Sequence, residues 1–271
     1  MSLFRKNKPA QSEKTTSETV VEYLQALFGA IVLAIIIRGF VFEPFKIPSE
    51  SMMPTLLVGD HIFVKRFAYG LRVPFTKKWL TEFDDPKRGD VVVFSFPQDE
   101  SVDFIKRVVG VPGDKIILKE GILFVNGKEV ESHDIMLGDP TPENRCRMQL
   151  DEESNKLLPE GFAPYPYYRM IQNFQPKIET FENGQTHFTQ RSKVAPREAD
   201  GEWEVKSGEF FVMGDNRDHS EDSRFWGFVP RENLKGKAEF IWLSLNYEGV
   251  KCPSDFLFFK VRWDRFGRAI I

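Results

Sequence analysis

Two serines stand two residues apart in the segment PSESMMPTL (48–56), and a hydroxyl held in a fixed position is what a nucleophilic catalyst requires. Pro48 and Pro54 flank Ser49 and Ser51. Because proline fixes φ and removes a backbone donor, we expect a rigid, non-helical turn. A polar turn without any chemistry has the same composition, so this segment needs a base elsewhere in the chain to become a candidate active site.

The base for such a serine is most often histidine, but neither His61 nor His219 comes with an obvious triad pattern. A neutral lysine is the other option, and Lys106 lies in a predicted strand, where Phe104 and Val108 project to the same face. Burial between two apolar side chains disfavours the charged amine and lowers its pKa. The alternative is a lysine whose stem is buried while its amine stays in water, which is the commoner arrangement on strands.

A third polar segment, GDNRDHSEDSR (214–224), lies between two apolar runs. Its Asp and Arg residues alternate at short spacing, so they can form a hydrogen-bonded ion-pair network that stiffens a loop. A solvated hairpin tip is the alternative. The sequence FWGF (225–228) directly after it favours a loop that docks on apolar structure.

The elements that must position these groups are predicted to be strands. Short runs rich in β-branched and aromatic residues recur between turn residues, at 60–64, 90–94, 104–109, 116–118, 122–125, 209–213 and 238–243. The pair Asn126-Gly127 is a strong hairpin signal, and 17 prolines and 19 glycines suit a turn-rich protein. The sequence therefore predicts a mostly β fold built on an antiparallel β domain.

The domain boundaries follow from shifts in composition. Residues 1–19 are polar and are expected to form a cytoplasmic tail, and 20–42 are an apolar run just long enough for one transmembrane helix. Residues 43–128 and 201–271 make the two parts of the β domain, and the polar stretch 129–200 is an insertion or a second small domain. The excess of positive charge before the apolar run predicts that the tail stays inside and the rest crosses. A cleaved signal peptide is the alternative, but no small-x-small site follows the run.

The overall composition narrows the classes of partner. A net charge of −3 offers no basic face, so nucleic acid is not an expected partner. The four histidines show no metal-ligand spacing and no glycine-rich phosphate loop is present, so we expect neither a metal nor a cofactor. Cys146 and Cys252 are far apart in sequence, and the sequence leaves open whether they form a disulfide.

The ordered segments PSESMMPTL, RGDVVVF (88–94), FIKRVVGVPGD (104–114) and GDNRDHSEDSR resemble the four soluble-domain motifs of bacterial type I signal peptidase, or leader peptidase. The resemblance covers about residues 20–128 and 205–245. It implies a membrane-bound serine endopeptidase that uses a Ser–Lys dyad to remove N-terminal signal peptides from secreted preproteins, cutting after small residues. It further implies a single-pass protein of the bacterial plasma membrane, in contact with the lipid bilayer, whose catalytic domain lies on the extracytoplasmic side.

The same resemblance assigns roles to individual positions. Ser51 is the implied nucleophile and Lys106 the general base, while the Ser49 hydroxyl and the Ser51 backbone N–H form the oxyanion hole. Ser220 would hydrogen-bond Lys106 and orient it. The implied supporting network consists of Arg107, Asp215, Asp222 and Arg224. The implied pocket for small substrate side chains is lined by Phe45, Ile47, Met52, Ile62, Val93, Phe104 and Ile105. The chain departs from the family pattern at Glu50, where glycine is frequent, and at His219, where asparagine is familiar.

Two other functions fit parts of the sequence. One is a soluble, self-cleaving repressor-type serine–lysine protease, which the apolar run at 20–37 disfavours. The other is a non-catalytic, membrane-anchored β domain that binds partners in the cell envelope, in which Ser51, Lys106 and Ser220 would be replaceable. Covalent labelling of Ser51 by a serine-directed probe separates the second from an enzyme.

Overall fold

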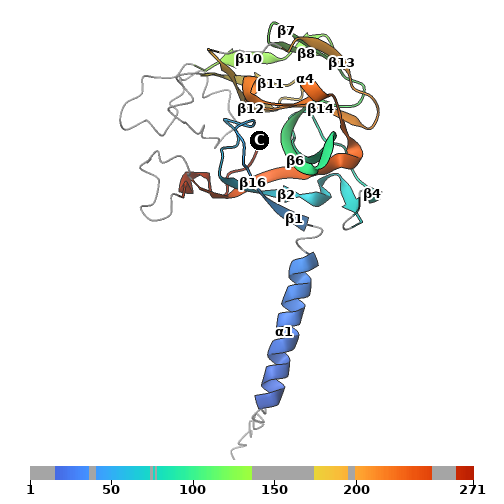
Figure 1. Ribbon diagram of the computed structural model, residues 1–271, viewed down its shortest axis with the longest axis vertical. Coiled ribbons are helices and arrows are strands. Elements are labelled where there is room, and N and C mark those ends of the chain that lie inside the picture. The colour runs from blue at the N-terminus through green and yellow to red at the C-terminus, as the bar shows by residue number, and fades with distance from the viewer. Residues whose placement is uncertain are drawn as a thin grey trace, which may run out of the picture.

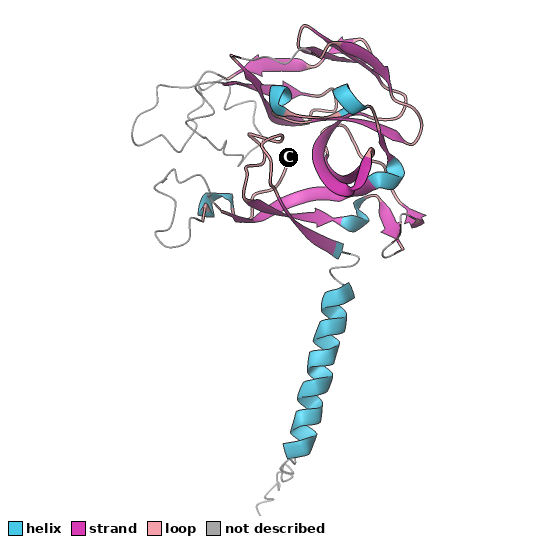
Figure 2. Ribbon diagram, viewed as in Figure 1, coloured by secondary structure: helices cyan, strands magenta, loops and turns pink. Residues whose placement is uncertain are grey.

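The computed structural model describes residues 16–36, 41–73, 76, 78–135, 174–194, 199–245 and 261–271. In these ranges the chain is mostly β, as predicted, with one long helix, α1 (Thr16–Ile36), that lies apart from the body of strands (Figures 1 and 2). Cys146 and Cys252 fall outside the described residues, so the question of their pairing lies there too.

The largest sheet has seven strands in the order β1-β2-β16-β5-β6-β14-β15. Its strands are β1 (Phe42–Lys46), β2 (Asp60–Lys65), β5 (Val91–Phe96), β6 (Asp99–Gly110), β14 (Glu209–Met213), β15 (Val229–Pro230) and β16 (Leu234–Ser244). Every neighbouring pair in it is antiparallel, which confirms the predicted sheet type. The sheet brings strands from both ends of the chain into one layer.

Three smaller sheets complete the described body. They are β13-β7-β8-β9, β10-β11-β12 and the hairpin β3-β4. Their strands are β3 (Gly70–Arg72), β4 (Trp79–Glu82), β7 (Lys115–Lys119), β8 (Ile122–Val125), β9 (Lys128–Glu129), β10 (Glu131–Asp134), β11 (Phe174–Thr180), β12 (Thr186–Ser192) and β13 (Gly201–Glu204). The sheet β10-β11-β12 belongs to the stretch predicted as an insertion, and it lies at the end of the body away from α1 (Figure 1).

The hairpin between β8 and β9 confirms the turn predicted from Asn126-Gly127. Asn126 has φ of 54° and Gly127 has φ of 79°. Positive φ at both central residues is the geometry of a two-residue hairpin loop, which asparagine and glycine tolerate best. Val125 pairs with Lys128 across the turn.

The strand that carries Lys106 is the longest in the structure's described part. β6 is exposed over its first five residues and buried over its last six. Its buried half, from Ile105 to Gly110, is flanked by β5 and β14. The backbone of that half is therefore paired with a strand on each side, which fixes the directions of its side chains.

The helix α1 covers the predicted membrane segment only in part. Large apolar side chains between Val20 and Val32 are exposed, among them Leu24 at 60%, Leu27 at 57% and Phe28 at 70%. Within the residues that the structure describes, no helix combines the length and the apolar character needed to cross a bilayer.

The buried apolar side chains form three clusters. The first surrounds Met52 and Ile105, the second Phe211 and Ile116, and the third Phe94 and Val108. Because Phe104 and Ile105 alternate along β6, they pack into different cores. The strand therefore holds Lys106 at the boundary between two packed regions.

Two short helices, which are the last elements needed to describe the site, follow β14. A 3₁₀ turn runs over Arg217–His219, and the one-turn helix α4 covers Ser223–Trp226. We call residues 214–224 the Asp–Arg loop and residues 49–56 the Ser51 turn. The Ser51 turn closes with backbone hydrogen bonds from Met53 N to Glu50 O and from Leu56 N to Met52 O.

Candidate active site

Ser51 and Lys106, 55 residues apart in sequence, meet in a buried contact. Lys106 Nζ donates a hydrogen bond to Ser51 Oγ at 2.8 Å, and a second to its neighbour's carbonyl, Ile105 O, at 2.9 Å. The exposed fraction is 7% for Ser51 and 4% for Lys106. A lysine whose amine, and not only its stem, is withdrawn from water is the arrangement that a neutral base requires.

The surroundings of Lys106 weaken its charged form. Burial lowers the pKa of Lys106 to about 8, against an opposing pull from Asp222 and Asp215, while Arg224 adds a further lowering. Its Nζ also lies 5.1 Å from the ring centroid of Phe104, so this neighbour helps exclude water from the amine. At neutral pH about a tenth of such lysines carries no proton.

Ser49 lies beside the same serine. Its Oγ is 3.4 Å from Ser51 Oγ, and unlike Ser51 it is exposed. Between them Glu50 is also exposed, and its carbonyl oxygen accepts hydrogen bonds from Met53 N and Asn216 Nδ2. A hydroxyl at this place is within reach of an acyl group attacked by Ser51.

The four predicted network residues form two buried, bidentate ion pairs. Arg107 Nε and Nη2 donate to Asp215 Oδ1 and Oδ2 at 2.8 and 2.7 Å. Arg224 Nε and Nη2 donate to Asp222 Oδ1 and Oδ2 at 2.7 and 2.8 Å. Asp222 Oδ2 also accepts from Gly214 N at 2.9 Å, and the same carboxylate caps α4. These bonds fix the two ends of the Asp–Arg loop on each other, so the loop is a rigid element and not a solvated hairpin tip.

The structure corrects one expectation for Ser220. Ser220 is 1% exposed, but its Oγ has no hydrogen-bond partner, so the implied bond to Lys106 is not formed. The Lys106 amine donates to Ile105 O instead. Ser220 is nevertheless adjacent to the site, because a Cβ on Gly214 would collide with Ser220 Oγ and lie 2.5 Å from Ser51 O. Glycine at 214 therefore lets the Asp–Arg loop lie close to the Ser51 turn.

Six of the seven predicted pocket residues share one apolar cluster. Ile47, Met52, Ile62, Val93 and Ile105 are buried in it and Phe45 packs against it. Phe104 does not join them. Its ring stacks on Phe96 with centroids 4.5 Å apart, on the face of β6 that also carries Lys106. Strand alternation separates Phe104 from Ile105, so its place is beside the amine.

Two residues that the sequence analysis missed join the Asp–Arg loop to the Ser51 turn. Asn216 N donates to Ser51 O at 3.0 Å, and its side chain donates to Glu50 O at 3.1 Å. Thr55 Oγ1 donates to Asp215 Oδ2 at 2.5 Å. Neither residue is distinctive by type, and bonds to backbone atoms leave no pattern in a sequence.

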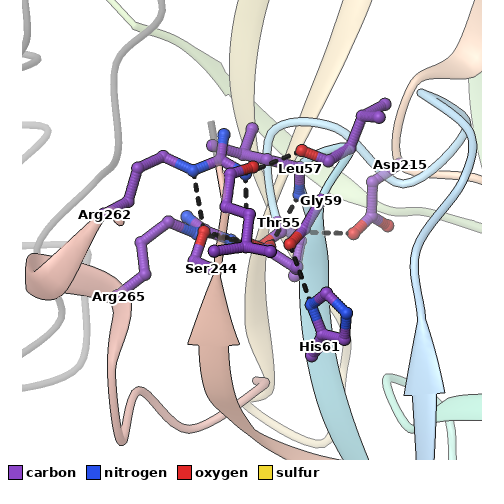
Figure 3. A network of polar contacts seen from close by, with 11 residues as sticks. Thr55, Leu57, Gly59, His61, Asp215, Ser244, Arg262 and Arg265 are labelled. Atoms are coloured by element: carbon purple, nitrogen blue, oxygen red, sulfur yellow. Dashed lines mark hydrogen bonds and ion pairs between the residues drawn. The ribbon is translucent and has the colours of Figure 1, made fainter. Parts of the chain in front are cut away.

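A polar network behind the Ser51 turn was also missed. Figure 3 shows Arg262, Arg265 and Ser244 converging on the segment between Thr55 and Gly59. Its centre is the fully buried carboxylate of Asp60, which accepts from Ser244 Oγ at 2.6 Å, Arg265 Nε at 3.0 Å and Leu57 N at 2.8 Å. Arg265 Nη2 also donates to Thr55 O at 3.0 Å, and Arg262 Nη2 to Val58 O at 2.7 Å. The C-terminal segment 261–271 thereby holds the turn from behind.

The charged side chains of this region are paired with one another in the described ranges. No group of three or more His, Cys, Asp or Glu side chains in them is placed to hold a metal ion. The chemistry that the residues offer is a buried nucleophile and base with rigid ion pairs around them.

The chain matches known proteins over most of its length. The family described as "Signal peptidase, peptidase S26" matches residues 20–243. Signal peptidase I of Buchnera aphidicola subsp. Baizongia pistaciae is 36% identical over 270 residues, which is 93% of this chain and 84% of the relative. Signal peptidase I of Pseudomonas fluorescens is 39% identical over 244 residues, covering 86% of this chain and 76% of the relative. Signal peptidase I of Haemophilus influenzae is 34% identical over 304 residues, covering 96% of this chain and 80% of the relative.

These matches define the class of protein as a serine peptidase. The chain belongs to the signal peptidase family S26, whose substrates are preproteins that carry a signal peptide. The resemblance of its four motifs to this family is confirmed.

Proposed function

We propose that this protein removes signal peptides with a Ser51–Lys106 dyad, held at a bacterial plasma membrane by one N-terminal anchor over residues 20–42. The observation that carries the proposal is the 2.8 Å contact between Lys106 Nζ and Ser51 Oγ, at a lysine only 4% exposed. A serine and an amine in this position do no evident structural work that two apolar side chains would not do better.

The chemistry follows from the protonation state of Lys106. When its amine is neutral, its lone pair accepts the proton of Ser51 Oγ while the oxygen attacks the scissile carbonyl. The protonated amine then returns the proton to the leaving amino group, and a water molecule later releases the acyl group by the same route. Serine attack without a neighbouring base would be slow, since a free hydroxyl is a weak nucleophile.

The negative oxygen of the tetrahedral intermediate needs preorganised donors. We assign this role to the Ser49 hydroxyl and the Ser51 backbone N–H, as the family resemblance implies. The 3.4 Å separation of the two serine oxygens supports the assignment, because a carbonyl attacked by one lies within reach of the other. The buried pairs Arg107–Asp215 and Asp222–Arg224 keep the surrounding loop in place.

Specificity for small side chains is assigned to the cluster around Met52 and Ile105. Ile62, Val93 and Ile105 come from strands of one sheet, and Met52 packs against them from the Ser51 turn, so the wall they form is rigid. Rigid packing admits alanine before the cut and two residues earlier, and larger side chains overpack it at a cost of about 1–3 kcal/mol.

Membrane attachment is supported by the surface nearest α1. Phe42, Phe63 and Phe240 form one aromatic cluster with centroid separations of 5.3 to 6.3 Å, on the neighbouring strands β1, β2 and β16, of which β1 is the first strand after α1. With the exposed apolar side chains of α1, these residues suit a lipid interface. A catalytic domain on the extracytoplasmic side would then meet the cleavage sites of membrane-held preproteins.

The test is cleavage of a preprotein with alanine at both specificity positions, by the purified full chain in detergent. Ser51→Ala and Lys106→Met should each lower kcat/KM about 10³-fold or more, and the double variant little further, because the two residues act as a unit. Lys115→Met, on the exposed face of β7, is the matched control and should cleave normally.

A second arm replaces both alanines of the substrate by leucine and should lower kcat/KM about 10–100-fold.

Near-wild-type cleavage by either dyad variant would refute the assignment of Ser51 and Lys106. No cleavage by the wild type would favour the non-catalytic envelope module.

A further inference from the structure

The sheet β10-β11-β12, from the stretch predicted as an insertion, makes buried contacts with the Asp–Arg loop. Gln190 N on β12 donates to Asp215 O at 2.9 Å, and Gln190 forms a parallel bridge with Asn216. Ser192 N donates to Asp218 Oδ2 at 2.6 Å. The Asp–Arg loop is thus bonded to the inserted sheet on one side, as it is to the Ser51 turn on the other.

Two charged residues of the inserted sheet reach into this contact: Arg191 Nη2 on β12 donates to Asp218 Oδ1 at 3.3 Å, and Glu179 is the more buried of the two. Glu179, on β11, is 6% exposed, and its Oε2 accepts from Arg217 Nη2 at 2.5 Å. Its other oxygen, Oε1, accepts from Thr189 Oγ1 on the neighbouring strand at 3.3 Å. Arg217 is itself 4% exposed, so this ion pair is closed off from water at both ends.

The surroundings of the Glu179–Arg217 pair show which group balances the charge of Arg217. His187 on β12 is buried against Phe181 with ring centroids 5.0 Å apart, and its Nε2 lies 3.6 Å from Glu179 Oε2. Burial, with Arg107 and Arg217 nearby, holds the pKa of His187 well below its usual range, so it stays neutral. Glu179 is therefore the carboxylate that balances the Arg217 charge in this pocket of side chains. An apolar contact of the same volume would stabilise the fold as well, but it would not fix the register of the loop.

The path from Glu179 to the nucleophile is short. Arg217 follows Asn216, whose N–H holds Ser51 O at 3.0 Å, and the Arg217 carbonyl accepts from Arg224 Nη2 at 2.5 Å. Arg224 in turn pairs with Asp222, whose charge acts on Lys106. A shift of Arg217 would move both the backbone that holds Ser51 and the charges that set the Lys106 amine.

We propose that Glu179 is a positioning residue of the catalytic machinery, and that the inserted sheet sets the geometry of the Ser51–Lys106 pair by holding Arg217 through it. This inference rests on the proposed function, and it gives the stretch 129–200 a part in the reaction. Glu179 touches neither substrate nor the reacting atoms.

The experiment compares Glu179→Ala and Glu179→Gln with Glu182→Ala in the full-length protein. Glu182 is the matched control, because it lies in the turn of the same β11–β12 hairpin but forms an exposed pair with Lys128. Glu179→Gln keeps the size and one acceptor oxygen for Arg217, so it tests the charge with the smallest change in shape. The readouts are kcat and KM separately, kcat/KM against pH, and the fraction of molecules labelled at Ser51 by a serine-directed probe.

Loss of the hold on Arg217 should lower kcat per labelled site about 10²-fold in Glu179→Ala, since a displacement of about 1 Å is that costly. KM should change little, because the pocket lies in another cluster. The acid limb of kcat/KM should move upward as water reaches the amine. Glu179→Gln should show both effects to a smaller extent, and Glu182→Ala neither.

Equal kcat per labelled site and an unmoved acid limb in both Glu179 variants would overturn the inference, even if these variants melted at a lower temperature. That result would mean that Glu179 serves only the fold. A wild-type protein that neither cleaves preprotein nor is labelled at Ser51 would overturn the proposed function and this inference together.

Discussion

At the scale of single residues, the proposed reaction requires Lys106 to be neutral often enough to act as a base. Burial lowers its pKa to about 8, so the amine is protonated at acid pH and is increasingly deprotonated above neutrality. The two nearest carboxylates oppose this shift, so the lowering is achieved by the exclusion of water. Phe104, 5.1 Å from Nζ, is a principal part of that exclusion.

The pH dependence of cleavage tests this cause. For the wild type, kcat/KM should rise with pH along an acid limb with a midpoint near pH 8, as the amine loses its proton. Phe104→Asn admits water, stabilises the charged amine and should move this limb upward, towards an ordinary lysine near 10.5. Phe266→Asn is the control, at a phenylalanine that is 62% exposed. Identical limbs in wild type and Phe104→Asn would mean that another neighbour sets the pKa.

At the scale of elements, the Ser51 turn is held between two segments that are remote in sequence. The Asp–Arg loop bonds it through Asn216 and Thr55, and the C-terminal segment bonds it through Arg265, while Arg262 bonds Val58 just after it (Figure 3). The C-terminal segment also contributes Ile270 to the core around Met52. Ser51 is therefore fixed by packing and hydrogen bonds on both sides of its turn.

Asp60 is the residue whose loss should damage this arrangement most. Asp60→Ala leaves Arg265 and Arg262 buried without their carboxylate, so it should lower the free energy of unfolding by about 3–5 kcal/mol. Denaturant unfolding at pH 7 measures this, with unchanged slope as the sign of an unchanged native state. Glu202→Ala breaks an exposed pair with Lys115 and should leave the unfolding midpoint almost where it was. A similar midpoint for Asp60→Ala and Glu202→Ala would show that the buried network does not hold the turn.

The sequence predicted the elements better than their contacts. Strands such as β5 and β8 were predictable because β-branched and aromatic residues run between turn residues. The strands β10, β11 and β12 were missed because their residues are polar and weakly periodic. The pairing of Ser51 with Lys106 came from resemblance to a family, since no local pattern brings two residues 55 positions apart into contact.

The contacts that escaped prediction have a common physical reason. Asn216 acts on Ser51 mainly through its backbone N–H, which any residue but proline possesses. Arg265 reaches Asp60 across 205 positions of sequence, and neither residue type marks its partner. Ser220 is the opposite case: a bond to Lys106 was predicted from the family pattern, but the structure does not form it.

At the scale of the whole molecule, the body of strands and α1 have different structural characters. The body holds the strands around the Ser51–Lys106 pair, and α1 carries exposed apolar side chains. We infer that attachment raises the local concentration of membrane-held substrate without altering the chemistry.

Removal of the N-terminal segment separates these two contributions. A chain that begins at Val41 should match the full chain on a short, soluble peptide substrate. On a preprotein embedded in vesicles it should be about 10²-fold slower, since the encounter is no longer confined to the membrane. Rates measured for both proteins on both substrates decide this, and equal rates on the vesicle-bound preprotein would argue against the anchor.

The most direct test of the central claim is covalent labelling of the full chain with a serine-directed acylating or phosphonylating probe, read by peptide mass spectrometry. We predict one adduct, on Ser51, that forms faster as pH rises towards 8, slowly in Lys106→Met and not at all in Ser51→Ala. Lys115→Met should be labelled like the wild type. An adduct on another residue, or undiminished labelling in Lys106→Met across the pH range, would contradict the Ser51–Lys106 mechanism.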